Sequence, residues 1–244
     1  VAALSLGIMI DSYGERSLIY ALLVTQLVIF LLAFILPEKK INFTQFNKRS
    51  IWPILKQREV IVLLLSCALM VSSHGLLYNF YSIFLEDQGY SGATIGLLWS
   101  VGVVFEILIF LLMPKILSKF TLKSVLLISI AFAVLRFFLI GAYVDSILIL
   151  IAAQIMHAAT FGSFHVASIQ LIAHFFYNEH QARGQSLYNS ITYGVGGAIG
   201  GLGGGYMIEY SGMANTFMLS AILPFVGFFV LLLGLKTKFK AEFK

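Results

Sequence analysis

Five ionisable side chains interrupt long apolar stretches of the sequence: His74, Glu106, Arg136, His157 and His165. A charge at the centre of a membrane helix costs about 3 kcal/mol or more, so such residues tend to be paired and to face a cavity. A carboxylate and an imidazole can exchange protons, and a guanidinium can bind an anion. The alternatives are structural: histidines that hydrogen-bond between helices, and a locked ion pair between Glu106 and Arg136.

Polar and aromatic residues also form stripes in four of these stretches. At about 100° per residue, the members of each stripe share one helix face. The stripes are Cys67, Met70, His74, Tyr78 and Tyr81; Ile95, Trp99, Gly102, Glu106 and Phe110; Gln154, His157, Phe161, His165 and Ser168; and Gln185, Asn189, Tyr193, Gly196 and Gly200. Rings in such stripes, Trp99 among them, could pack between helices or bind an aromatic or sugar ring.

Motifs for metal binding, nucleotide hydrolysis or hydrolytic catalysis are missing from the sequence. His157 and His165 are eight residues apart, and there is no H-E-x-x-H and no glycine-rich phosphate loop. The single cysteine, Cys67, has no partner for an internal disulfide. We therefore expect no enzyme activity, no metal and no cofactor.

Composition places these residues in a membrane. The 244 residues are 59% hydrophobic and 11% charged, with a mean hydropathy of +0.94. A membrane helix needs about 20 apolar residues, so this length allows roughly six to eight spans. The apolar stretches are Val1–Ile10, Ser17–Leu36, Glu59–Leu85, Thr94–Met113, Lys123–Val144, Ser146–Phe176, Gln185–Tyr210 and Met213–Leu235.

Basic residues gather in every second connection. Of the 16 lysines and arginines, all but Arg16 and Arg136 lie in segments 37–58, 114–123, 177–184 and 236–244, whereas the intervening connections are acidic. The positive-inside rule places the basic segments and the C-terminus in the cytoplasm. A nucleic-acid partner is not expected, since it would need one continuous basic patch. Segment 37–58 could be a hinge along the inner membrane surface or an ordinary anchor.

An internal repeat indicates the architecture. Gly7–Gly14 and Gly205–Gly212 both read G-x-M-I-acid-x-x-G, and each precedes one apolar span and a basic stretch. The two copies are six helices apart, which is typical of transporters built from two parallel six-helix halves.

These features resemble the major facilitator superfamily of secondary transporters, and the run Gln154–Ala167 resembles its phenylpropionate permease branch. The resemblance implies an all-α membrane protein in which 1–36 ends an N-terminal bundle (part of helix five, and helix six). Residues 37–58 would form the central cytoplasmic loop, 59–235 a C-terminal six-helix bundle and 236–244 a basic tail. It also implies that the four stripes converge on a cavity, and that the rest of the N-terminal half is a missing partner.

The related lactose-permease-type proton symporters have an acidic residue, an arginine and a histidine in helices eight, nine and ten, where this sequence has Glu106, Arg136 and His157. By this resemblance the three residues couple a proton to transport. Thr160 stands where those symporters have a second carboxylate, so the roles must be divided differently.

The expected cavity residues are drawn from the four stripes. They are His74, Tyr78, Trp99, Gln154, Phe161, His165, Asn189 and Tyr193. Gly196, Gly200 and Gly204 belong to a run of glycines expected to pack helices closely or to act as a hinge.

The predicted function is proton-coupled symport of a small organic solute, such as an aromatic acid, a sugar or a nucleoside, in a bacterial cytoplasmic membrane. Efflux by proton antiport would use the same groups. A channel, a structural membrane subunit and an intramembrane enzyme are weaker alternatives.

Overall fold

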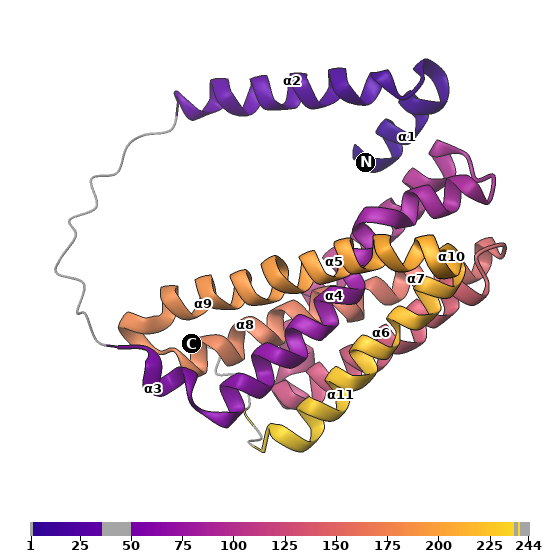
Figure 1. The fold of residues 1–244 in the computed structure, drawn as a ribbon. Coiled ribbons are helices and arrows are strands. Elements are labelled where there is room, and N and C mark those ends of the chain that lie inside the picture. The colour runs from indigo at the N-terminus through magenta and orange to yellow at the C-terminus, as the bar shows by residue number, and fades with distance from the viewer. Residues whose placement is uncertain (1, 36–49, 237–238, 240–244) are drawn as a thin grey trace.

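Within residues 2–35, 50–236 and 239, which the computed structural model describes, the chain is helical and has no strands (Figure 1). The elements are α1 (Ala2–Tyr13), α2 (Arg16–Ala33), α3 (Trp52–Leu55), α4 (Arg58–Asp87), α5 (Gly92–Lys119), α6 (Leu122–Ala142), α7 (Ile147–His157), η1 (Ala158–Ser163), α8 (Phe164–Phe175), η2 (Asn178–His180), α9 (Gln181–Asn189), η3 (Ser190–Gly196), η4 (Ile199–Gly203), α10 (Gly204–Ser220) and α11 (Ile222–Gly234). Most of the expected central loop (36–49) and of the basic tail (237–238 and 240–244) lies outside the described residues.

Six helical stretches in the described residues are long and apolar enough to cross a membrane. The longest covers residues 178–234, and Gly212 breaks it with φ 75° and ψ 166°. Because 57 residues of helix would extend far beyond a bilayer core of about 30 Å, this stretch supplies two crossings that meet at Gly212. The prediction of an all-α membrane protein is confirmed.

One boundary differs from the expectation. The span predicted to end at Met113 continues as α5 through Pro114 to Lys119. Proline is tolerated inside membrane helices, because neighbouring groups can satisfy the backbone carbonyl that it leaves free. The segment expected to be a loop therefore lengthens the helix, and only Phe120 and Thr121 connect α5 to α6.

Small residues allow the helices to approach closely around α4, which is buried along most of its length. An added Cβ at Gly75 would lie 2.6 Å from the carbonyl oxygen of Gly197, and one at Gly196 would lie 2.7 Å from that of Ala68. Cβ atoms at Gly200 and Gly204 would overlap Ser72 and Leu76. Glycine contacts of this kind are typical of membrane helix interfaces, where packing rather than the hydrophobic effect holds helices together.

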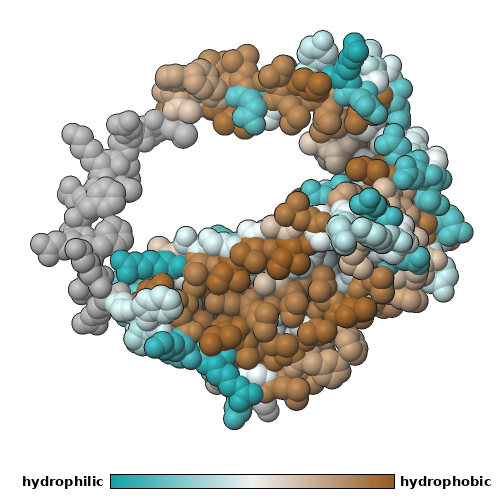
Figure 2. Space-filling view, viewed as in Figure 1, coloured by the Kyte–Doolittle hydropathy of each residue, from teal (hydrophilic) through white to brown (hydrophobic). Residues whose placement is uncertain are grey.

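The two ends of the bundle differ in charge. The turns after α1, α4 and α6 and the break at Gly212 within α10 lie at one end, here called the acidic end, with Asp11, Glu86 and Asp145 near them. α3, the α5–α6 connection and the end of α11 lie at the opposite, basic end (Figure 1). Figure 2 shows a broad hydrophobic belt between polar ends, as expected for a surface in contact with lipid.

Candidate functional site

Arg136 is the most deeply buried charge of the bundle, with none of its surface exposed. Its Nε donates to the carbonyl oxygen of Ala153 over 2.8 Å, and Nη2 donates to Gln154 Oε1 over 3.4 Å. Nη1 lies 3.3 Å from Thr160 Oγ1 and 3.5 Å from His74 Nε2. All of these partners are neutral acceptors, so the guanidinium is held in place by dipoles rather than by a carboxylate.

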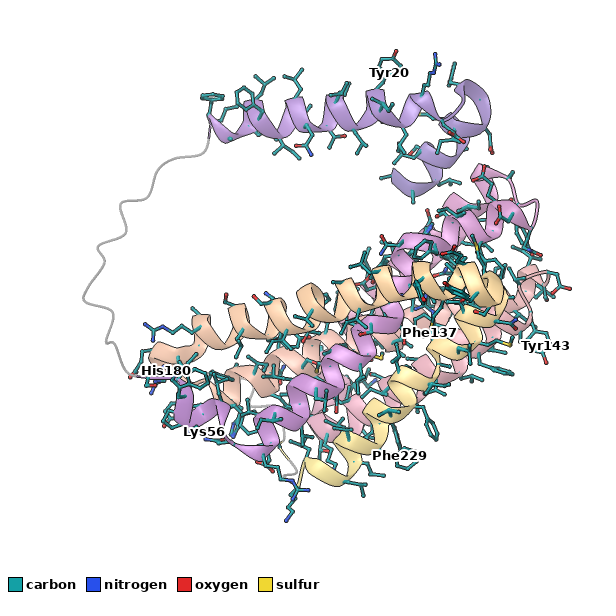
Figure 3. All side chains as sticks on the ribbon, viewed as in Figure 1. Tyr20, Lys56, Phe137, Tyr143, His180 and Phe229 are labelled. Atoms are coloured by element: carbon teal, nitrogen blue, oxygen red, sulfur yellow. The ribbon has the colours of Figure 1, made fainter. Side chains whose placement is uncertain are left out.

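The hydrogen bonds of His74 determine which of its ring nitrogens carries the proton. Nδ1 lies 3.1 Å from the carbonyl oxygen of Met70, which can only accept, so Nδ1 is the donor. Nε2 then has a free lone pair directed at the guanidinium of Arg136. Phe137, labelled in Figure 3 inside the bundle, packs edge-on against the His74 ring at 5.2 Å. His74 is therefore a neutral, fixed hydrogen-bond acceptor for Arg136.

Glu106 lies beside His157, with Oε2 3.9 Å from His157 Nε2. The Glu106 side chain keeps 17% of its surface exposed, and that of His157 keeps 6%. Gly102 makes this approach possible, because a Cβ there would lie 3.0 Å from Gln154 Oε1 and 3.5 Å from His157 Cδ2. Within the membrane region of the described chain, His157 is the ionisable partner that faces Glu106, and no ion pair joins Glu106 to Arg136.

Aromatic rings from four helical segments, the His157 ring among them, meet beside Glu106. We call them the ring cluster, which consists of Tyr78, Trp99, His157, Phe161, His165 and Tyr193. Tyr78 stacks on Trp99 at 6.1 Å between ring centroids, and Phe161 stacks between His157 at 5.3 Å and His165 at 5.9 Å. The Tyr193 hydroxyl lies 2.9 Å from His165 Nδ1. The structure thus brings the four stripes together.

Exposure separates this region into two layers. Arg136, His74 and Gln154 are buried, whereas 47% of the Tyr78 surface is exposed. The remaining members of the ring cluster apart from His157 are half-buried. The rings and the carboxylate of Glu106 are therefore partly accessible at the surface of the described chain, whereas the guanidinium of Arg136 is not.

Two π-helical segments position the ring cluster. η1 lies between His157 and His165, and η3 contains Tyr193. A π-helix has more residues per turn than an α-helix and is frequent at functional sites. Phe161 in η1 and His165 at the start of α8 stack with their planes 3° apart.

One expected cavity residue lies elsewhere. Asn189 is exposed on α9 and makes no hydrogen bond or ring contact with the ring cluster. Gly196, Gly200 and Gly204, which were expected to pack helices closely or to act as a hinge, lie against α4.

Ser82 and Tyr81 support the ring cluster and were not among the expected site residues. Trp99 Nε1 donates to Ser82 Oγ over 3.0 Å, and the buried Tyr81 ring packs edge-on against Trp99 at 5.5 Å. Ser82 follows Tyr78 by four residues on the same helix face, and this spacing could have identified it.

Comparison with known proteins agrees with this architecture. The profile of the MFS_1 like family matches residues 1–219. The chain is 34% identical over 149 residues to a protein of Escherichia coli (strain K12) named "Probable 3-phenylpropionic acid transporter", which covers 61% of this chain and 39% of that protein. It is 26% identical over 150 residues to the "Uncharacterized transporter YwbF" of Bacillus subtilis (strain 168), covering 62% of this chain and 37% of the relative.

A solved structure shares the fold. The crystal structure of the nucleoside transporter NupG superposes with a TM-score of 0.81 at 17% identity, over 96% of this chain and 65% of that one. The chain therefore spans less than half the length of the curated relatives and about two thirds of the structural neighbour. The profile match over most of the sequence shows that the chain belongs to the MFS_1 like family, a family of major facilitator transporters.

Proposed function

We propose that this chain forms part of a proton-coupled transporter for a small organic solute with an aromatic ring, with an aromatic monocarboxylate as the first candidate. The observation that carries the proposal is the Glu106–His157 pair, 3.9 Å apart, beside the half-exposed ring cluster. The site offers a proton carrier and flat binding surfaces in one place.

Glu106 carries the proton in this proposal. It is a partly exposed carboxylate, located fourteen residues after α5 begins and thirteen before it ends. His157 Nε2 faces it and can hydrogen-bond its neutral form or pair with its ionised form. Arg136 is a fixed positive charge that positions His74 and Gln154, since its donors are already directed at neutral acceptors.

The ring cluster binds the solute. Stacking on Tyr78, Trp99 or Phe161 would hold an aromatic ring, and His165 with Tyr193 would supply polar groups for a carboxylate. The names of the relatives, one a 3-phenylpropionic acid transporter and one a nucleoside transporter, are consistent with a solute that carries an aromatic ring.

Transport would proceed by alternating access, with 59–235 rocking as one bundle against a bundle to which 1–36 belongs. The connection 37–58 and the tail 236–244 would face the cytoplasm at the basic end, in a bacterial cytoplasmic membrane. The proton gradient would set the direction of net flux.

The test measures uptake into proteoliposomes that contain the complete protein as its gene encodes it. 3-Phenylpropionate, uridine and lactose are compared under an imposed pH gradient, with and without an uncoupler. We expect saturable 3-phenylpropionate uptake that the uncoupler abolishes. Uptake that rises without saturation would indicate a channel, and uptake unchanged by the uncoupler would refute proton coupling.

A further inference from the structure

Asp11, at the acidic end of α1, binds the start of α5. Its Oδ1 accepts a hydrogen bond from the Gly92 amide over 2.8 Å, and Oδ2 accepts one from the Ala93 amide over 2.7 Å. The first amides of a helix have no partner within the helix and carry partial positive charge, so a carboxylate there satisfies two donors and is stabilised by the helix dipole. This contact joins residues 81 and 82 positions apart in the chain.

Close backbone packing accompanies these hydrogen bonds. A Cβ added at Gly7 would overlap the carbonyl oxygen of Gly92, and one at Gly96 would overlap that of Ala3. α1 and α5 therefore cross without intervening side chains. α2, which follows α1, has only Ser17 buried among its described residues. The first two helices are thus held to the bundle mainly through the contact between α1 and α5 (Figure 1).

A cavity of about 510 Å³ lies next to this contact. Its lining includes Asp11, Gly92, Glu86 and Tyr90 near the acidic end, and also Trp99. Trp99 stacks on Tyr78, so the cavity extends from the contact to the ring cluster. The contact between α1 and α5 borders this cavity.

The start of α5 is held in position from the other side as well. The Tyr90 hydroxyl donates to the carbonyl oxygen of Val144 in the next connection over 2.9 Å. Burial, together with the nearby carboxylate of Asp145, raises the pKa of the Tyr90 phenol. The amides that Asp11 binds therefore lie on an anchored segment.

We propose that the two hydrogen bonds from α5 to Asp11 form a latch that closes the acidic end of the transporter and must break for the ring cluster to open toward that side. This inference rests on the proposed function only in requiring alternating access. Asparagine at position 11 would keep one acceptor oxygen, but its side-chain NH2 group would face one of the two backbone N–H donors of α5. Asp11→Asn therefore weakens the latch.

The test is a distance measurement in the complete protein in nanodiscs without solute. Spin labels are placed at Tyr13→Cys on α1 and Leu97→Cys on α5, two exposed positions, with the buried Cys67 replaced by serine. The wild type is expected to give one dominant short distance. Asp11→Asn should raise the ratio of long to short distances roughly 2- to 5-fold, because a negative charge at a helix N-terminus contributes about 0.3–1 kcal/mol.

Two further variants keep the test decisive. Gly7→Ala should raise the same ratio by steric overlap without changing any charge, and Asp87→Asn, an exposed aspartate at the same end, should leave it unchanged. Equal distance distributions in wild type, Asp11→Asn and Gly7→Ala would refute the latch, as would an Asp87→Asn effect as large as that of Asp11→Asn. Because no solute is present, failure of the transport proposal would not alter these distances.

Discussion

Replacing Glu106 with glutamine should uncouple transport while preserving solute binding. The change keeps the size and the hydrogen-bonding reach of the side chain that faces His157 but removes the proton-carrying group. Within the membrane region of the described chain, Glu106 is the carboxylate in contact with the ring cluster, so we expect one proton per cycle.

The stoichiometry of one proton per cycle sets how far the solute can accumulate. A charge crossing the membrane gains about 2.3 kcal/mol per 100 mV, and one pH unit corresponds to about 1.36 kcal/mol. A neutral solute moving with one proton could therefore accumulate about 50-fold per 100 mV, and tenfold more per pH unit. A monocarboxylate moving with one proton carries no net charge, so it should respond only to the pH gradient, about tenfold per unit.

The assay sets the pH gradient and the membrane potential separately in proteoliposomes and measures the steady-state ratio of internal to external solute. For 3-phenylpropionate we expect the wild type to follow the pH gradient, and Glu106→Gln to reach a ratio near one while still exchanging internal for external solute. Glu209→Gln, at an exposed carboxylate of α10, is the matched control and should behave like wild type. Unchanged accumulation in Glu106→Gln would refute the role of Glu106 as proton carrier.

Two further predictions concern binding and packing. Trp99→Leu should raise the KM for the solute about tenfold. An aromatic pair contributes ~0.5–1.5 kcal/mol, and the hydrogen bond to Ser82 is also lost. An unchanged KM in uptake assays would argue against stacking. Gly200→Ala should lower the free energy of unfolding in detergent by about 1–3 kcal/mol, since the new Cβ overlaps the backbone of Ser72. Gly194→Ala is the control and should be nearly neutral, because a Cβ there meets nothing within 4 Å. Equal thermal stability of the two alanine variants would contradict the packing.

The sequence pattern predicted the membrane helices, and the resemblance to a known family predicted that the four stripes meet. Length and hydropathy predicted the spans, because a bilayer leaves the backbone few alternatives to a helix. The position of Glu106 at the centre of one span, and of His157 in another, identified them as residues that hydrocarbon would penalise. Helical spacing placed Tyr78 on the same face as His74, and the two rings lie 6.1 Å apart.

Several contacts could not be predicted. Arg136 and Glu106 were natural partners by charge, but a pairing between helices depends on how each helix is rotated and shifted, which periodicity within one helix does not specify. The π-helical segment around Phe161 was not predicted, because no local residue pattern revealed it. Asp11 was recognised as part of a repeat and an acidic connection, but its partners are backbone amides, which have no signature in the sequence.

The environment of Arg136 indicates what kind of charge the site favours. A buried cation without a carboxylate partner is costly, and here four neutral acceptors offset only part of that cost. Its positive potential extends through Gln154 and His157 toward the ring cluster, where few intervening groups can screen it. An ionised Glu106 or a bound carboxylate would each lower the energy of the buried cation, and the two anions would repel each other. Protonation of Glu106 should therefore accompany binding of an anionic solute, and the fixed arginine would couple the two events without moving.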